Sequence, residues 1–155
     1  MAKVTKSIRV NVPVHTAYNQ WTQFESFPQF MEGVEQVQQL DDKRLHWRAK
    51  IGGKDVEWDA EIMEQVPDQR IAWRNTNGAT NAGAVDFHRV GENECEISLT
   101  METEPHGLVE TVGDALGFLD RRIESDMERF KEFIEHQGVE TGAYRGEIRG
   151  SEVRR

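Results

Sequence analysis

Three tryptophans carry the clearest chemical signal in this sequence. Trp47, Trp58 and Trp73 each stand in a stretch where apolar residues alternate with charged ones, so all three are predicted to face the same interior. An indole ring can bury about 200 Å² and its N–H prefers a hydrogen-bond acceptor. Three such rings could therefore wall a site for a planar aromatic ligand. The same rings could also fill an ordinary core, and the two interpretations differ in whether a space of roughly 300–1,000 Å³ remains beside them.

Acid–base candidates are fewer. His88 flanks Phe87 and is expected to point outward unless a bulge near Gly83 reverses the strand. His106 precedes a long predicted helix and could stand at a pocket entrance. Arg122 falls at the edge of that helix's apolar stripe, where it could orient a carboxylate or enolate. These three are the catalytic candidates, and the catalytic residues themselves stay unknown.

Several kinds of chemistry find no support in the motifs. No His or Cys lies three or four residues from another, and HExxH is absent, so no metal site is predicted. The sequence has no G-x-S-x-G motif, no phosphate-binding loop and no dinucleotide fingerprint, so no cofactor is expected.

Composition narrows the class of protein. The chain has 155 residues, with 19 basic and 28 acidic side chains and a net charge of −9. This length suits one domain, and the acidic surface disfavours nucleic-acid partners. No apolar run approaches the ~18 residues that a membrane span requires, so membrane insertion is not expected. The single cysteine, Cys95, gives no sign of an oxidising compartment, which favours the cytoplasm.

Hydrophobic periodicity predicts the elements that position these residues. A first strand ends at Pro13, and two short helices follow between residues 14 and 33. From Val34 to Thr103 the pattern is that of an antiparallel sheet. Residues 44–51 and 56–62 form a hairpin around a two-glycine turn, with basic residues on the outer face of one strand and acidic residues on the other. Because one face of each strand is apolar, the sheet needs a cover on that side.

A long helix over residues 107–136 provides the cover. Its apolar positions step by three or four residues: Leu108, Val112, Leu116, Leu119, Ile123, Met127, Phe130 and Ile134. The predicted fold is therefore α+β, with a curved antiparallel sheet of about seven strands wrapped around a long C-terminal helix. Residues 1–137 form this single domain, and residues 138–155 are expected to be a polar, flexible tail.

The space between sheet and helix is the natural place for a ligand. The side chains expected to line it are Trp47, Trp58, Trp73, Phe87, Met101, Leu116, Leu119 and Ile123. Near its mouth we expect Phe27, Phe30 and Met31.

Four segments carry a family resemblance. They are Ile8-x-Val-x-Val-Pro-Val, Tyr18-x-x-Trp21, Phe27-Pro28-x-Phe30-Met31-x-Gly33-Val34, and Trp58-Asp-Ala-Glu-Ile-x-Glu-x-Val-Pro-Asp-x-Arg-Ile-Ala-Trp73. In their order and spacing they resemble the polyketide cyclase/dehydrase family of the START-like (SRPBCC) helix-grip superfamily, over about residues 4 to 136. The resemblance implies an apolar tunnel for aromatic polyketides, quinones or lipids. Some relatives are aromatases or cyclases and others are coenzyme Q-type carriers, and no catalytic motif of either group maps onto this chain.

Three functions follow as alternatives. The leading one is binding of a hydrophobic or aromatic small molecule in a polyketide cyclase/dehydrase-like cavity, and whether the protein is an enzyme stays open. The second is a non-catalytic lipid or quinone carrier or chaperone. The third is a stress-related protein-interaction module with a filled core. The sequence allows either a monomer or a homodimer.

Overall fold

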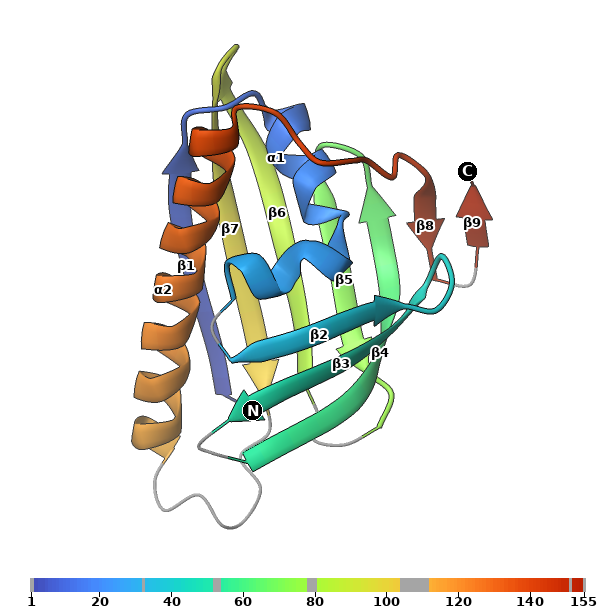
Figure 1. Cartoon of the computed structure of the whole chain (residues 1–155), viewed down its shortest axis with the longest axis vertical. Coiled ribbons are helices and arrows are strands. Elements are labelled where there is room, and N and C mark those ends of the chain that lie inside the picture. Colours follow the sequence, from blue (N-terminus) through green and yellow to red (C-terminus); the bar gives the residue numbers. More distant parts are fainter. Residues whose placement is uncertain are drawn as a thin grey trace.

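The computed structural model of the chain describes residues 2–31, 33–51, 54–77, 81–103, 112–150 and 152–154. Its elements in chain order are β1 (Ala2–Val10), α1 (Val14–Trp21), the 3-10 helix η1 (Phe24–Gln29), β2 (Val34–Gln39), β3 (Arg44–Ile51), β4 (Lys54–Val66), β5 (Arg70–Asn75), β6 (Asn81–Gly91), β7 (Glu94–Thr103), α2 (Val112–Gln137), β8 (Glu147–Arg149) and β9 (Glu152–Arg154). The long helix α2, α1 and η1 lie on the same side of the curved sheet (Figure 1).

The sheet is antiparallel and follows the order β1-β7-β6-β5-β4-β3-β2. These seven strands are the sheet that the sequence predicts, and the α+β fold class is confirmed. Two short strands are added within the described residues, because β8 pairs with β4 and β9 pairs with β8.

The β3–β4 hairpin has the register that its alternating pattern predicts. Trp47 is the cross-strand partner of Trp58 on the inner face, and Arg48 is the partner of Glu57 on the outer face. The predicted turn, residues 52–53, lies outside the described residues. Since a shift of one residue would exchange the two faces, the apolar inner face and the charged outer face specify the same register.

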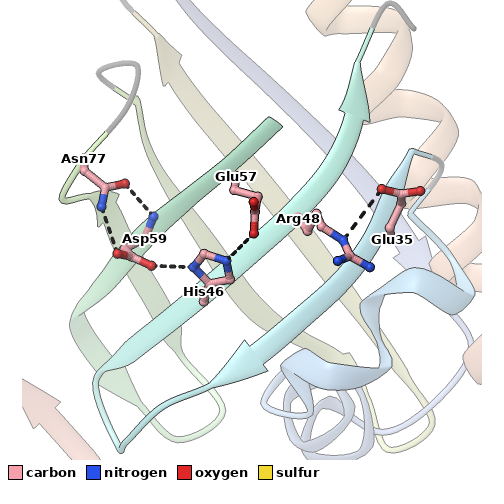
Figure 2. Close-up of polar contacts among 6 residues, drawn as sticks. All are labelled: Glu35, His46, Arg48, Glu57, Asp59 and Asn77. Atoms are coloured by element: carbon pink, nitrogen blue, oxygen red, sulfur yellow. Dashed lines mark hydrogen bonds and ion pairs between the residues drawn. The ribbon is translucent and has the colours of Figure 1, made fainter. Parts of the chain in front are cut away.

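The outer face of this hairpin carries a network centred on His46 (Figure 2). The two ring nitrogens of His46 lie 2.6 Å from an Asp59 oxygen and 2.9 Å from a Glu57 oxygen. Asn77 adds an amide hydrogen bond of 2.8 Å to Asp59. Arg48 forms an ion pair of 3.9 Å with Glu35 of β2. Polar contacts on the outer face therefore connect β2, β3 and β4 with the segment that follows β5.

Helix α2 shows the predicted apolar stripe where its side chains are described. Ile123, Met127, Phe130 and Ile134 are all buried. Residues 104–111, among them His106, lie outside the described residues, and so do the side chains of Leu116 and Leu119.

The C-terminal segment differs from the flexible tail that its composition predicts. Ile148 of β8 pairs with Gln65 of β4 and is fully buried. Arg145 donates two hydrogen bonds, of 2.8 and 2.9 Å, to the Asp68 carboxylate, and its guanidinium lies 5.5 Å from the centre of the Tyr18 ring. One buried side chain and one two-point ion pair anchor a segment whose average composition is polar, and composition averages do not reveal such isolated anchors.

Candidate ligand-binding site

A cavity of about 210 Å³ lies between the sheet and α2. Its volume is below the range expected for drug-sized ligands, so it suits a compact molecule. The lining side chains are almost all apolar or aromatic, with three polar exceptions. They are Trp21, Phe27, Met31, Val34, Trp47, Ala49, Trp58, Trp73, Asn75, Leu99, Met101, Arg122, Ile123 and Asp126.

The indoles of Trp47 and Trp58 form one wall as a stacked pair. Their ring centres are 5.7 Å apart and their planes differ by only 10°. The stack follows from the hairpin, because the two residues are directly opposite one another on adjacent strands. Phe27 of η1 stands 5.6 Å from the Trp47 ring at 53°, so it extends the aromatic wall in another direction.

Trp73 contributes a second wall, which depends on a glycine. Trp73 of β5 and Met101 of β7 are both cross-strand partners of Gly83 on the intervening strand β6. A Cβ at Gly83 would lie 2.5 Å from Cζ2 of Trp73 and 2.8 Å from Sδ of Met101. The missing side chain therefore leaves the space over β6 that these two side chains occupy.

Arg122 and Asp126 bring charge to the α2 side of the cavity. The Arg122 guanidinium lies against the backbone of Gly33, at a point where a Cβ would clash with its Nη2 atom. Gly33 also has a φ of 84°, and its carbonyl accepts a 2.6 Å hydrogen bond from the Lys50 N–H. A glycine thus lets the helix place a cation where β2 and β3 border the cavity.

Two indole N–H groups of the lining are buried without a hydrogen-bond partner among the described residues: Nε1 of Trp21 and Nε1 of Trp47. The residues are 1% and 8% exposed, respectively. A buried donor without a partner costs roughly 1–3 kcal/mol, so such groups are few in folded proteins.

The structure brings most of the predicted site residues together. Around the cavity it places Phe27, Met31, Trp47, Trp58, Trp73, Met101, Ile123 and the catalytic candidate Arg122.

Phe30 and Phe87 are buried elsewhere. The Phe30 ring meets Phe130 at 5.1 Å, and the Phe87 ring meets Tyr18 at 5.3 Å, both edge to face. Phe87, expected in the lining, and Phe30, expected near the mouth, are therefore not among the residues that line this cavity. Side chains of α1 and α2 cover that part of the interior, and the rings pack against them.

The remaining candidates do not reach the cavity or cannot be placed. His88 is exposed, and the irregularity in its strand lies between Arg89 and Gly91 rather than near Gly83, so nothing turns His88 inward. His106, Leu116 and Leu119 fall outside the described side chains.

Sequence reasoning missed six lining residues: Trp21, Val34, Ala49, Asn75, Leu99 and Asp126. Strand alternation marked two of them as inward-facing, since Ala49 and Leu99 occupy apolar positions of predicted strands. Asn75 and Asp126 carried no such signal, because polar residues at the end of a strand or on a helix usually face solvent.

Comparison with known proteins assigns this chain to a family. Residues 10–132 match the family model described as polyketide cyclase / dehydrase and lipid transport. The chain belongs to this family. It is 52% identical over 149 residues to an uncharacterized 17.2 kDa protein in the melC2-rnhH intergenic region of Streptomyces lincolnensis, and the match covers 96% of this chain and 99% of the relative.

Solved structures with the same fold confirm the START-like architecture. A START superfamily protein from Mycobacterium smegmatis superposes with a TM-score of 0.79 at 12% identity, covering 87% of this chain and 98% of the other. The Zhui aromatase/cyclase from a Streptomyces species has a TM-score of 0.73 at 14% identity, covering 92% and 99%. At these identities the likeness concerns the fold alone.

Two further properties bear on the site. In the part of the chain that the structure describes, no group of three or more His, Cys, Asp or Glu side chains is arranged to hold a metal ion. No described helix combines the length and apolar character needed to cross a membrane.

Proposed function

We propose that this protein binds a compact hydrophobic or aromatic small molecule in the cavity between the sheet and α2. The observation that carries the proposal is the cavity itself, which stays open beneath α2 although Trp47, Trp58 and Trp73 all line it. The filled-core alternative requires those indoles to close the space completely, so a cavity of about 210 Å³ counts against it even though this volume lies below the roughly 300–1,000 Å³ of typical ligand pockets.

Aromatic ligands suit the walls best. The parallel pair of Trp47 and Trp58 presents flat aromatic surface, and aromatic rings gain about 0.5–1.5 kcal/mol from favourable ring contacts beyond the area they bury. Burial itself contributes about 25 cal/mol per Å² of apolar surface. Met101 adds a thioether that adapts to ligands of different shape.

The chemistry available at the walls supports binding more strongly than turnover. Among the described lining residues, the ionisable side chains are Arg122 and Asp126. Cys95 is not a nucleophile candidate, because burial raises the pKa of its thiol to about 11. A polyketide cyclase-like reaction would rely on the walls to hold a flexible polyketone in a reactive shape, with Arg122 stabilising an enolate. The carrier alternative requires only that the ligand leave unchanged.

The partner is therefore proposed to be a polyketide, quinone or lipid of compact size, bound by a monomer or a homodimer. We place the protein in the cytoplasm, on the support of one free and buried cysteine that gives no sign of an oxidising compartment.

Native mass spectrometry of protein purified from its own host tests the proposal. A co-purified hydrophobic adduct is expected. The adduct is then incubated with the protein and released, which distinguishes a carrier from an enzyme. A carrier returns the adduct unchanged, whereas an enzyme returns a product. A titration with 2-naphthol, followed by quenching of the tryptophans, gives an independent measurement. Absence of both an adduct and saturable quenching would overturn the proposal.

A further inference from the structure

The C-terminal segment holds the end of α1 on both sides of a residue that lines the cavity. Residues 140–149, which we call the strap, run from the end of α2 past α1 and into β8 (Figure 1). Trp21 is the last residue of α1 and lines the cavity. Its neighbours Gln20 and Thr22 are 0% and 2% exposed, and both are hydrogen-bonded to the strap. The strap therefore fixes the chain immediately before and after a residue of the cavity wall.

These hydrogen bonds use the backbone of the strap as well as its side chains. Thr141 donates its backbone N–H to Oε1 of Gln20 at 2.9 Å, and its hydroxyl accepts a bond of 3.1 Å from Nε2 of Gln20. The backbone N–H of Tyr144 donates to the Thr22 hydroxyl at 3.0 Å. The same hydroxyl donates to the carbonyl of Asn19 in the last turn of α1. The strap is thus bonded to polar groups at the point where the helix ends.

Two anchors keep the strap in this position. Arg145 donates two hydrogen bonds to the Asp68 carboxylate and a third, of 2.7 Å, to Oδ1 of Asn19. Ile148 is buried where β8 pairs with β4. The strap's hydrogen bonds to α1 are only partly buried, and such contacts open at a lower free energy than a packed core. The strap can therefore leave α1 while the sheet stays folded.

The ring of Trp21 connects the strap to the ligand site. Its centre lies 4.9 Å from that of Phe130 and 5.7 Å from that of Phe27, both edge to face. Phe27 also lines the cavity, whereas no residue of the strap is among the described lining residues. A change in how the strap holds α1 therefore reaches the cavity through Trp21 and not by direct contact.

We propose that the strap and the cavity are coupled through Trp21. The docked strap holds the Trp21 ring in the cavity wall, with Gln20 and Thr22 as positioning residues, and a bound ligand in turn holds the strap on α1. This inference rests on the proposed function, since it requires that the cavity bind a ligand. The strap lies beyond residues 10–132, which match the family model, so the coupling belongs to the C-terminal extension of this chain.

Amide exchange in the unmodified chain tests the coupling directly. The backbone N–H groups of Thr141 and Tyr144 exchange with solvent when the strap leaves α1. Saturating 2-naphthol should slow the exchange of both about fivefold or more, which is the lower end of typical coupling between two sites. The control is the backbone N–H of Lys43, which a side chain also holds at the surface, through a 2.8 Å bond to Oδ1 of Asp41. Its exchange rate should not change.

A variant with a detached strap tests the same coupling from the other side. Arg145→Gln combined with Ile148→Ser removes both anchors in the full chain. Because coupling is reciprocal, its affinity for 2-naphthol should fall by the same factor by which 2-naphthol slows strap exchange. Equilibrium dialysis measures this affinity.

The position of Trp21 has a readout of its own, which needs no ligand. The four tryptophans give four indole N–H signals in a nitrogen-15 spectrum. Detaching the strap should move the Trp21 signal more than the other three. Arg154→Gln is the matched control, because Arg154 is exposed and pairs with Glu152 within β9. This variant should change neither the 2-naphthol affinity nor the Trp21 signal.

The outcomes separate this inference from the proposed function. If 2-naphthol binds but leaves the exchange of Thr141 and Tyr144 unchanged, the coupling is overturned and the proposed function stands. If detaching the strap leaves the Trp21 signal in place, the role of Trp21 is overturned whether or not a ligand binds. If the double variant does not fold, exchange in the unmodified chain decides. If 2-naphthol does not bind the unmodified chain, the proposed function fails and the coupling with it.

Discussion

Beneath α2, the part of the interior that faces α1 is packed with contacting aromatic rings, whereas the part beside the β3–β4 hairpin holds the cavity. The packed half is defined by Tyr18, Phe30, Phe87 and Phe130, whose rings contact one another or Trp21. The hollow half is defined by the cavity lining. Trp21 and Phe27 belong to both, since they line the cavity and contact the packed rings.

The difference teaches that facing inward and lining a site are separate properties. Both halves use apolar side chains of one sheet face and one stripe of α2. In the packed half, Trp21 of α1 and Phe30, which follows η1, both meet the Phe130 ring of α2 edge to face. In the hollow half, the small side chain of Ala49 borders the cavity, and Gly83 leaves the room that Trp73 and Met101 occupy.

Truncating one large side chain in each half should give the largest difference in the free energy of unfolding. Phe130→Ala is expected to lower the free energy of unfolding by about 3–5 kcal/mol, because it removes a fully buried ring from close-packed neighbours. Met101→Ala, in the hollow half, should cost about 2 kcal/mol or less, because one side of Met101 already faces empty space. Urea denaturation measures both. Similar losses for the two variants would mean that the halves do not differ in packing.

Enlargement should have opposite consequences in the two halves. Ala17→Leu adds atoms to the packed half, where Ala17 is fully buried, and should destabilise the protein by about 1–3 kcal/mol. Ala49→Leu adds the same atoms to the cavity wall. It should leave the melting temperature almost unchanged while weakening 2-naphthol binding at least tenfold. A stable Ala49→Leu protein with full affinity would show that the ligand binds elsewhere.

Gly83 tests how far the hollow half depends on a missing side chain. In Gly83→Ala, the new Cβ would overlap atoms of Trp73 and Met101, so those side chains must shift. Because those side chains can move while the backbone stays in place, the free energy of unfolding should fall by only about 1 kcal/mol. The ligand affinity should fall by more than that. Gly91→Ala is the control, since a Cβ added at Gly91 would meet no atom within 4 Å. Thermal melts and 2-naphthol titrations should leave the control unchanged, and an equal effect in both variants would contradict the explanation.

Much of this architecture is predictable because the spacing of apolar residues and the placement of charged residues indicate the same inner and outer faces. Trp47 and Trp58 alternate with charged residues on two strands that share one tight turn, so the inner face and the register follow together. The same holds for the stripe of α2, from Ile123 to Ile134. These are local patterns, and local patterns are what a single sequence displays.

What could not be predicted depends on contacts between distant segments. Phe87 faces inward as expected, but only the position of Tyr18 on α1 decides that it is covered. Asp126 reaches the cavity although its helical neighbours include solvent-facing acids. Ile148 is anchored by pairing with β4, more than 80 residues earlier in the chain, and no pattern within the C-terminal segment encodes that partner.

The smallest expected effect concerns the outer face of the hollow half, where His46 links strands β3 and β4. Hydrogen bonds that the His46 ring donates to Asp59 and then to Glu57 raise the pKa of His46 above its ordinary value. A pKa raised by folding means that protonated His46 stabilises the folded state, fully below about pH 6.5 and progressively less as pH rises through the higher folded value. The melting temperature should therefore fall slightly between pH 6 and pH 9.

His46→Gln should remove this slope, and His88→Gln, a change at an exposed histidine of β6, should retain it. Asp59 acts in a different range, because its hydrogen bond with His46 lowers the pKa of the Asp59 carboxyl and that contribution is lost only in acid. Amide exchange can localise the effect: above pH 7, protection should decrease in β3 and β4 while β6 and β7, which β5 separates from the hairpin in the sheet, keep theirs. A uniform loss across all four strands would mean that the hairpin does not open as an independent unit.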